Sequence, residues 1–369
     1  MLKKAIIDYQ KKRYASAEHL IRKVLSSNRS NWVAWNYLGL LQKQKKDYQQ
    51  AMNSFEFALK LCPISAELNC NIGNLCVDLG DMPKAHLYYL KSIEIEPSNT
   101  LFQLNYLESC KYLQLINDEI AVEKLLLSYP ADNNTFTASV WSAIRDYQQG
   151  NLDASIDKLI KSKPLLDIKD YKLQPVQIYW DYLARLIKWR TRNIYFAGNK
   201  DARVVYVIGE SHSISAHGTF VKYNNLDYQC QSKWIPGVKQ WHIQKNSNNK
   251  FKFAFNMVLS GLPRGAVILT TIGEIDCRLG EGILEYSTKY KKDLDLVIKT
   301  TIDNYLLYIQ SVRSDFDFIV CGVPATNVNK NIEQKKIHAD LLRKFNHYLK
   351  NATHKSGFRF LDVYNLNRP

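Results

Sequence analysis

The feature that most constrains the fold of this chain is a spacing of 34 residues that recurs through its first half. Glycines, prolines and alanines all keep this spacing, and apolar residues lie between them at helical intervals. The positions that share it are Gly39 and Gly73, Pro63 and Pro97, and Ala17, Ala51 and Ala85. Small residues at fixed positions let two antiparallel helices pack closely, and a proline ends a helix. The sequence therefore predicts a series of similar helix pairs.

This pattern resembles the tetratricopeptide repeat. Three units are in register, and two weaker units follow at residues 102–130 and 136–164. From the resemblance we expect an α-solenoid of about five helix pairs over residues 1–165. We expect a further helix over residues 174–192, inside a capping or linker region at 166–200. Solenoids of this kind present a concave surface to a protein or peptide partner.

The second half of the chain has a different pattern. Short, continuous apolar runs rich in β-branched residues predict buried strands, at 204–208, 266–270, 316–320 and 358–363. Helical patterns separate these runs, at 250–260, 291–313 and 333–351. This alternation predicts an α/β domain over residues 201–369, with a parallel sheet and helices on both faces. In such sheets, ligands bind at the carboxyl ends of the strands.

Reactive side chains gather after two of these predicted strands. The first strand ends in Gly209, Glu210, Ser211 and His212, and the loop at 234–241 contains Gly237. The second strand ends in a dense group of two carboxylates, a thiol and a guanidinium, namely Gly273, Glu274, Ile275, Asp276, Cys277 and Arg278. We interpret this edge of the sheet as the candidate site.

These segments resemble the conserved blocks of the SGNH (GDSL-like) hydrolase superfamily, over roughly residues 201–369. Gly209-Glu210-Ser211 stands where that superfamily has Gly-Asp-Ser, and Gly273-Glu274-Ile275-Asp276 stands where it has Gly-x-Asn-Asp. The string that continues to Arg278 is similar to a bacterial branch of the superfamily. The resemblance implies a three-layer α/β/α, flavodoxin-like domain that hydrolyses or transfers an acyl ester, without a cofactor and without a metal.

The resemblance also implies roles for individual residues. Ser211 is the expected nucleophile, and its backbone N–H and that of Gly237 are the expected oxyanion donors, with Gly273 and Asp276 in the third block. The candidate substrate or loop residues beside them are Glu210, His212, Glu274 and Arg278. For the acidic pair we keep two interpretations: Glu274 and Asp276 orient a base or bind a sugar hydroxyl, or Asp276 pairs with Arg278 and holds the loop. Cys277 is a nucleophile only if its pKa is lowered.

The sequence departs from the superfamily at two places. Ile275 occupies the position of the third-block Asn and has no side-chain donor. The superfamily takes its general base from Asp-x-x-His after the last strand, whereas the nearest string here is Asp362-x-x-Asn365, shortly before the sequence ends. We therefore expect either that the last loop is missing or that another histidine acts; His212 is adjacent to Ser211 and is not expected to align with its hydroxyl. The remaining histidine candidates are His217, His242 and His338.

The charge of the chain is high but divided. The formal net charge is +15 over 369 residues, yet residues 1–50 hold 11 basic and 3 acidic residues, and residues 51–150 hold 6 basic and 12 acidic ones. The favoured interpretation is a solvated, lysine-rich helical surface, so we do not expect a nucleic-acid partner. Short apolar runs and seven cysteines without metal-like spacing predict a cytoplasmic chain with no transmembrane segment and no secretory signal.

Three functions follow from these observations. The first is an SGNH-like esterase or acyl transferase that acts on an acylated carbohydrate, with the repeats recruiting a protein partner. The second is a catalytically impaired SGNH-like domain in a tetratricopeptide scaffold whose role is binding. The third is an RNA- or membrane-associated adaptor that uses its basic surface. A histidine nitrogen within about 3.2 Å of Ser211 Oγ would favour the first.

Overall fold

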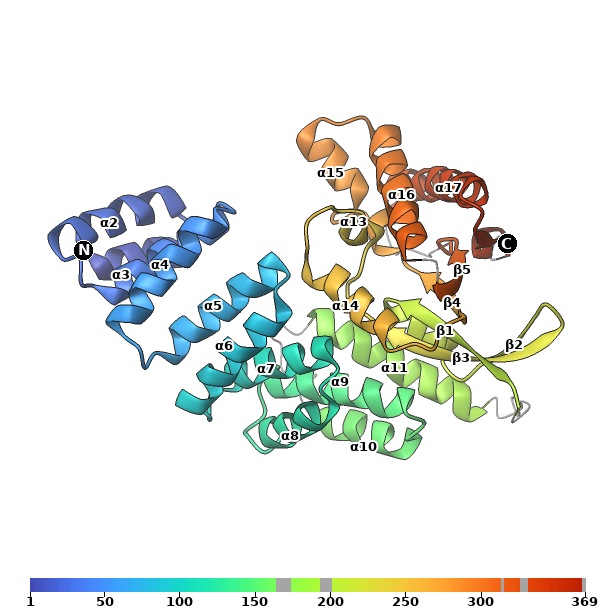
Figure 1. Cartoon of the computed structure of the whole chain (residues 1–369), viewed down its shortest axis with the longest axis horizontal. Coiled ribbons are helices and arrows are strands. Elements are labelled where there is room, and N and C mark those ends of the chain that lie inside the picture. The colour runs from blue at the N-terminus through green and yellow to red at the C-terminus, as the bar shows by residue number, and fades with distance from the viewer. Residues whose placement is uncertain (164–173, 193–200, 313–314, 326–330, 367–369) are drawn as a thin grey trace. The chain divides into compact units, whose positions relative to one another are not determined.

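The computed structural model describes residues 1–163, 174–192, 201–312, 315–325 and 331–366, and it divides into two compact units (Figure 1). The first unit consists of Met1–Ser139 together with Asn248–Phe253. The second unit consists of Val140–Ser247 and Ala254–Pro369. The expected domain boundaries at residues 165 and 200 stay a prediction.

Helical hairpins form the first unit, as the 34-residue spacing predicts. Its helices are α1 (Leu2–Gln10), α2 (Tyr14–Ser27), α3 (Trp32–Gln44), α4 (Tyr48–Leu61), α5 (Ala66–Leu79), α6 (Met82–Ile95), α7 (Thr100–Leu113) and α8 (Ile116–Leu126). Consecutive helices pack against each other throughout this series. The next helix, α9 (Asn133–Gln148), spans the boundary between the two units.

The recurring glycines mark places where two helices of a pair nearly touch. A Cβ atom added to Gly39 would lie 2.6 Å from the ring of Phe55, and one added to Gly73 would lie 2.6 Å from the ring of Tyr89. The two contacts are 34 residues apart at both ends, so each aromatic ring fills the space that the glycine leaves. Packing of this density explains why the small residues recur.

Helix caps repeat with the same period. Asn31, Ser65 and Asn99 each precede the first helix of a pair and accept a hydrogen bond from a backbone N–H of its first turn, at 3.0, 3.2 and 3.2 Å respectively. Asp47 and Asp81 cap the second helices in the same way. Caps of this kind satisfy N–H groups that have no partner inside the helix. The starts of these five helices are therefore encoded locally.

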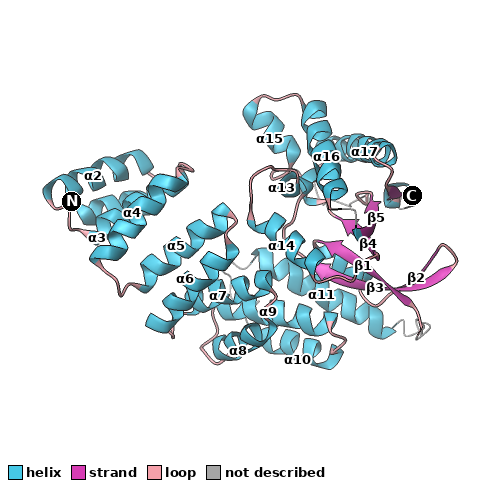
Figure 2. Cartoon of the chain, viewed as in Figure 1, coloured by secondary structure: helices cyan, strands magenta, loops and turns pink. Residues whose placement is uncertain are grey.

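The second unit contains two further repeat-like helices and a sheet (Figure 2). The helices are α10 (Leu152–Ser162) and α11 (Gln174–Arg192), and the second of these confirms the helix expected at 174–192. The strands are β1 (Arg203–Gly209), β2 (Phe220–Tyr223), β3 (Leu226–Trp234), β4 (Ala266–Thr271), β5 (Phe316–Cys321) and β6 (Arg359–Leu361). Their order in the sheet is β2-β3-β1-β4-β5-β6.

The sheet is mixed rather than purely parallel. Neighbouring strands from β3 to β6 run parallel, but β2 pairs antiparallel with β3 at the edge. The sequence patterns did not predict β2 and β3. Polar residues alternate along β3, from Leu226 to Trp234, whereas the strands were predicted from continuous apolar runs. The last strand is also shorter than expected, because a helical turn, α18 (Val363–Leu366), begins at Val363.

Amphipathic helices cover the sheet. They are α12 (Ser211–Ala216), α13 (Gln240–Ile243), α14 (Lys250–Ser260), α15 (Ile283–Tyr290), α16 (Leu294–Ser311) and α17 (Ile332–Lys355). The last part of the sequence thus has the helices that the patterns at 250–260, 291–313 and 333–351 predict. Phe255, Tyr305 and Phe345 are fully buried and form part of the core. Within the described residues, no helix has the length and apolar character needed to cross a membrane.

Candidate functional site

A very close contact between two strands fixes the start of the site. Gly209 ends β1 and lies between Trp234 of β3 and Thr271 of β4. A Cβ atom added to Gly209 would lie 2.2 Å from Thr271 Oγ1 and 2.8 Å from the Thr271 carbonyl oxygen. Only glycine fits at this position. The chain then turns directly into α12, which places Glu210 and Ser211 at the carboxyl edge of the parallel strands.

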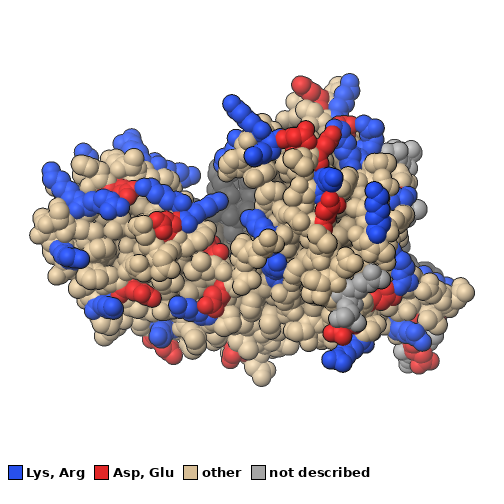
Figure 3. Space-filling model, turned by 45° about the horizontal axis from the view of Figure 1, so that its top comes forward, with Lys and Arg blue, Asp and Glu red and all other residues tan. Residues whose placement is uncertain are grey.

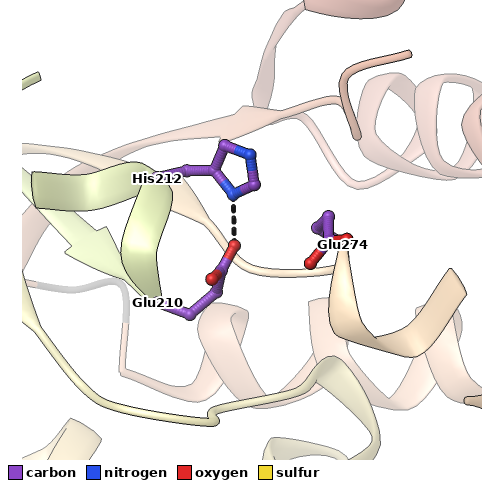
Figure 4. Close-up of side chains that lie close together, drawn as sticks. All are labelled: Glu210, His212 and Glu274. Carbon is purple, nitrogen blue, oxygen red and sulfur yellow. Dashed lines mark hydrogen bonds and ion pairs between the residues drawn. The ribbon is translucent and has the colours of Figure 1, made fainter. Parts of the chain in front are cut away.

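The carboxylate of Glu210 holds both of its neighbours in the sequence. Glu210 has no exposed surface, and its Oε2 accepts hydrogen bonds from Ser211 N at 2.6 Å and from Ser211 Oγ at 2.5 Å. Its Oε1 contacts Nδ1 of His212 (Figure 4). The hydroxyl of Ser211 therefore donates to a carboxylate, not to a histidine ring. One buried carboxylate lies between the hydroxyl and the imidazole.

The contact between Glu210 and His212 favours the charged form of both groups. Burial raises the pKa of Glu210, but the hydrogen bonds and the charge of His212 outweigh it, and the pKa is lowered overall. Burial lowers the pKa of His212, but the bond to Glu210 and the charges of Glu210 and Glu274 outweigh it, and the pKa is raised. An ionised Glu210 beside a readily protonated imidazole follows.

Arg278 pairs with Glu274, which corrects one of the two interpretations of this loop. Its Nε lies 2.9 Å and its Nη2 2.8 Å from Glu274 Oε2, and its Nη1 lies 3.2 Å from Glu281 Oε1. The expected pair between Asp276 and Arg278 is wrong. The i to i+4 spacing of Glu274 and Arg278 suits a pair across one turn, and the burial of Asp276 keeps its carboxylate away from the guanidinium.

Glu274 also lies near the first carboxylate. One potential metal-ligand atom from each of Glu210, His212 and Glu274, a carboxylate oxygen or a ring nitrogen, lies within 4.8 Å of the other two. Figure 4 shows the three side chains close together. Two carboxylates and an imidazole are ligands that several divalent metals accept. However, Glu210 already binds Ser211 and His212, and Glu274 is held by Arg278. The expectation of no metal stays a prediction.

Asp276 has a different task from Glu274. It has no exposed surface and accepts hydrogen bonds from the backbone N–H groups of Gln240 at 2.7 Å and Trp241 at 3.1 Å. Burial raises its pKa to about 7, and the two N–H bonds oppose that rise. Asp276 therefore ties the loop after β4 to α13. It is absent from the cluster of Glu210, His212 and Glu274, so the expected carboxylate pair beside the serine reduces to Glu274.

The remaining predicted residues lie where the strand ends place them. Gly237 follows Ile235, whose N–H donates to the Gly209 carbonyl at 2.8 Å, and its φ of 72° favours glycine. Gly273 has a φ of 144°, and a Cβ atom there would lie 3.0 Å from Val323. The roles of Ser211 and Gly237 as nucleophile and oxyanion donor stay predictions.

The two neighbours of Asp276 do not contribute reactive groups. Ile275 and Cys277 are both buried. Burial raises the pKa of Cys277 well above its usual value, and the charges of Asp276 and Glu274 add to that rise. The thiol therefore stays protonated, which removes its candidacy as a nucleophile.

The other candidates for a general base lie outside the cluster of Glu210, His212 and Glu274. His217 Nδ1 accepts a hydrogen bond from Ser232 N at 3.2 Å, and burial lowers its pKa to about 4. Asp362 pairs with Lys350 at 3.0 Å, and it also accepts from the Asn365 side chain at 2.8 Å. His338 is buried on α17, and His242 lies on α13. Residues 367–369 lie outside the described part.

Sequence reasoning did not find two tyrosines of α11. Tyr179 packs its ring edge-on against Trp234, with ring centroids 5.3 Å apart, and Trp234 is the β3 partner of Gly209. Burial raises the pKa of Tyr179 to about 12, and the charge of Glu210 raises it further. Tyr182 is hydrogen-bonded to Ser215 of α12. Their spacing of three residues, which places both on one face of the helix, is the signal that the sequence offers.

A pocket opens beside the cluster. It has a volume of about 240 Å³ and lies at the carboxyl ends of β4, β5 and β6. His212 and Glu274 are the charged side chains on its wall. Most of the other lining residues are apolar, and they include Leu269, Ile272, Val323, Pro324, Leu361 and Val363. A mainly apolar pocket with a few polar groups is typical of a small-molecule site.

Comparison with known proteins identifies part of the first unit. The family profile described as tetratricopeptide repeat matches residues 33–65 and 66–99. These residues are tetratricopeptide repeats. The match covers helices α3 to α6, where the glycine contacts and the caps recur. The first unit thus contains two tetratricopeptide repeats within a series of similar helix pairs, and we call it the TPR unit. Repeats of this type form surfaces that bind proteins.

Several solved structures are similar to part of the chain. PilW, a widely conserved type IV pilus biogenesis factor, is 21% identical with a TM-score of 0.41, and the match covers 53% of this chain and 92% of PilW. YrrB, a TPR protein with an unusual peptide-binding site, is 16% identical with a TM-score of 0.39, covering 50% of this chain and 90% of YrrB. No curated protein sequence matches the chain.

The TPR unit has a polar pocket of its own, of about 200 Å³. Residues of α3, α5 and α7 line it, including the ion pair of Lys43 with Asp78 at 3.1 Å. The amides of Asn74 and Asn105 also line it, and both contact the Cys70 sulfur. Basic and acidic side chains are interspersed on the face shown in Figure 3.

Proposed function

We propose that the second unit is an SGNH-like acyl hydrolase or acyl transferase whose nucleophile is Ser211, and that the TPR unit recruits its protein or peptide partner. The observation that carries the proposal is the pair of contacts on Glu210. Its Oε2 accepts a hydrogen bond from Ser211 Oγ at a distance of 2.5 Å, and its Oε1 contacts the imidazole of His212. A hydroxyl, a carboxylate and an imidazole are thereby joined beside an apolar pocket.

The strand order supports this proposal. Without β2, the parallel strands lie in the order β3-β1-β4-β5-β6. If these five strands are numbered along the sequence, the order is 2-1-3-4-5. Flavodoxin-like doubly wound sheets have this order, and they bind ligands where it reverses, between the first and third strands. Glu210 and Ser211 follow β1, and Glu274 follows β4, so the cluster lies at that switch point.

The proposed reaction balances with these three side chains. Ser211 Oγ attacks the ester carbonyl carbon and passes its proton to Glu210, while the C–O bond of the ester breaks and the leaving alkoxide takes a proton from His212 Nε2. Water, or an acceptor hydroxyl in a transfer reaction, then attacks the acyl-serine and gives its proton to His212. Glu210 returns the first proton to Ser211. The lowered pKa of Glu210 and the raised pKa of His212 match the required starting states.

The lining of the pocket supports a proposal about the substrate. The apolar wall at Val323 and Pro324 suits a short acyl group, and His212 on the same wall lies where it can meet the leaving oxygen. An acylated carbohydrate meets both requirements. We propose that class of ester as the substrate.

Two features predict slow turnover. The backbone N–H of Ser211 donates to Glu210 and is therefore not available to an oxyanion in this arrangement, and Ile275 offers no donor. Each missing donor lowers the rate by about 10²- to 10³-fold. These two features favour the second candidate function, a catalytically impaired domain that binds its ligand within the TPR scaffold.

The test compares purified chains on p-nitrophenyl acetate. We expect hydrolysis above background that disappears in Ser211→Ala and persists in Ser260→Ala, which removes an exposed serine hydroxyl on α14. Activity should fall as pH rises through the raised pKa of His212 and also as it falls through the lowered pKa of Glu210. Equal rates in the wild type and in Ser211→Ala would exclude the enzyme for simple esters and favour the impaired domain.

A further inference from the structure

One helix-end position in the TPR unit differs from its equivalents. A residue one or two positions after the first helix of each pair recurs every 34 residues with a left-handed backbone. Its φ is 58° at Lys12, 63° at Lys46, 77° at Gly80 and 58° at Gln114. Three of the four carry long side chains, although this backbone region favours glycine. The helix end therefore does not itself require glycine. Another contact must explain Gly80.

That contact is with a segment from far along the sequence. A Cβ atom added to Gly80 would lie 2.6 Å from Asn249 N and 2.8 Å from the carbonyl carbon of Asn248. Both are backbone atoms of residues 248–253, which belong to the first compact unit. A side chain at position 80 would displace this segment. Glycine at this one repeat position is thus matched to the segment that lies over it.

A charged side chain fixes the segment further along α7. Lys250 Nζ lies 3.1 Å from Glu108 Oε1 and 5.7 Å from the centroid of the Tyr112 ring. Asn249 Oδ1 accepts the N–H of Lys252 at 3.0 Å, so the docked segment ends in a capped helical turn. The close approach of the backbone to Gly80 and the contacts of Lys250 with α7 together make a specific contact.

We propose that residues 248–253 are an internal ligand of the TPR unit, and that a partner peptide with a capped, lysine-bearing helical turn binds the same surface of α5 and α7 by displacing them. Glu108 and Tyr112 select the lysine, and Gly80 admits the peptide backbone. The second half of this proposal rests on the proposed partner binding of the TPR unit. The internal docking does not, so it is measured first and without a partner.

The docking is tested by hydrogen exchange on the full chain. Gly80→Lys introduces the residue found at the equivalent Lys46, and Lys46→Gly is the reciprocal control. Amides of residues 250–253 should exchange about tenfold faster in Gly80→Lys and at the wild-type rate in Lys46→Gly. Unchanged exchange in a folded Gly80→Lys chain overturns the docking. Because that variant can fail to fold, the wild type is also treated with a carbodiimide, which should join Lys250 to Glu108 as an amide; absence of that cross-linked peptide overturns it equally.

The displacement is tested with a synthetic peptide of residues 246–256. Added to the wild-type chain, it should accelerate exchange of the chain's own residues 250–253, and a peptide with Lys250→Glu should have no effect. If the docking variants behave as expected but the peptide leaves exchange unchanged, the surface binds only its own segment, and partner binding on α5 and α7 is overturned.

Discussion

The two units satisfy their buried polar groups in different ways. In the TPR unit, caps such as Ser65 bond within the first turn of their own helix and recur from α3 to α7. In the second unit, buried carboxylates accept the hydrogen bonds. Glu210 binds Ser211 and His212, and Asp276 accepts hydrogen bonds from backbone N–H groups 35 and 36 residues away. A change in the first unit should therefore have a small, local effect. A change in the second should have a larger effect that depends on charge and pH.

The largest expected effect is the pH dependence that Asp276 confers. Its pKa is about 7 in the folded chain and near 3.8 in the unfolded chain. Between these values the folded protein keeps a proton that the unfolded chain has released, so the free energy of unfolding falls as pH rises through this window and levels off above it. The fall is about 4 kcal/mol between pH 4 and pH 8.

Urea unfolding of the wild type and of Asp276→Asn checks this prediction. The other titrating groups are common to both chains, so their contributions cancel in the difference. The variant should lack this fall, so the free energy of unfolding of the wild type should decrease by about 4 kcal/mol relative to that of the variant between pH 4 and pH 8. A constant difference between the two curves at all pH values would show that Asp276 does not titrate in this window.

The next largest effect is expected from the buried carboxylate of the cluster. Glu210→Ala leaves the Ser211 N–H and the His212 imidazole without their acceptor, which should lower the free energy of unfolding by about 3 kcal/mol. Glu108→Ala removes a carboxylate whose pair with Lys250 is partly exposed, and it should lower that free energy by less than about 1 kcal/mol. Chemical unfolding of both variants at pH 7 measures the contrast. Equal losses would contradict it.

A smaller effect is expected from crowding within one helix pair. Gly39→Ala places a methyl group 2.6 Å from the Phe55 ring, and after the gain in helix propensity it should lower stability by about 1–2 kcal/mol. Phe55→Leu in the same chain provides room for that methyl group. A double-mutant cycle should then show favourable coupling, whereas additive losses would mean that the contact does not limit packing.

A small effect is also expected from the caps. Ser65→Ala removes the acceptor for the Leu68 N–H and should lower stability by about 1 kcal/mol. Asn31→Ala acts at the equivalent position one repeat earlier. Because the two caps share no partner, thermal or urea unfolding of the double variant should give the sum of the single losses. Strong coupling would argue against local encoding of the repeats.

This difference also decides how much the sequence predicts. The 34-residue spacing predicts the helix pairs because contacts such as that of Gly39 with Phe55 join residues of the same repeat. The position of Ser211 after a buried strand follows from a local pattern as well. The partner of Arg278 does not, since three acidic residues lie within four positions of it and only packing selects Glu274 and Glu281 over Asp276.

Three other features depend on contacts between residues that are far apart in the sequence, so the sequence alone does not predict them. The alternating polar residues of β3 gave no continuous apolar run. Tyr179 of α11 precedes Ser211 by more than 30 residues in the sequence. Its position near the site depends on its contact with Trp234. Gly80 has the sequence context of an ordinary helix end, and only its contact with residues 248–249 distinguishes it. In each case the informative neighbour is distant in the sequence.

The most direct test of the proposed acyl-transfer site is labelling of Ser211 by a fluorophosphonate, with the modified peptide identified by mass spectrometry. Attack by Ser211 Oγ forms an O–P bond and releases fluoride, and Glu210 takes the hydroxyl proton. The account predicts a label on Ser211 that is lost in Ser211→Ala and strongly reduced in Glu210→Gln, with Ser260→Ala labelled as the wild type. An unlabelled Ser211 in the folded wild-type chain, or equal labelling in Glu210→Gln, would contradict it.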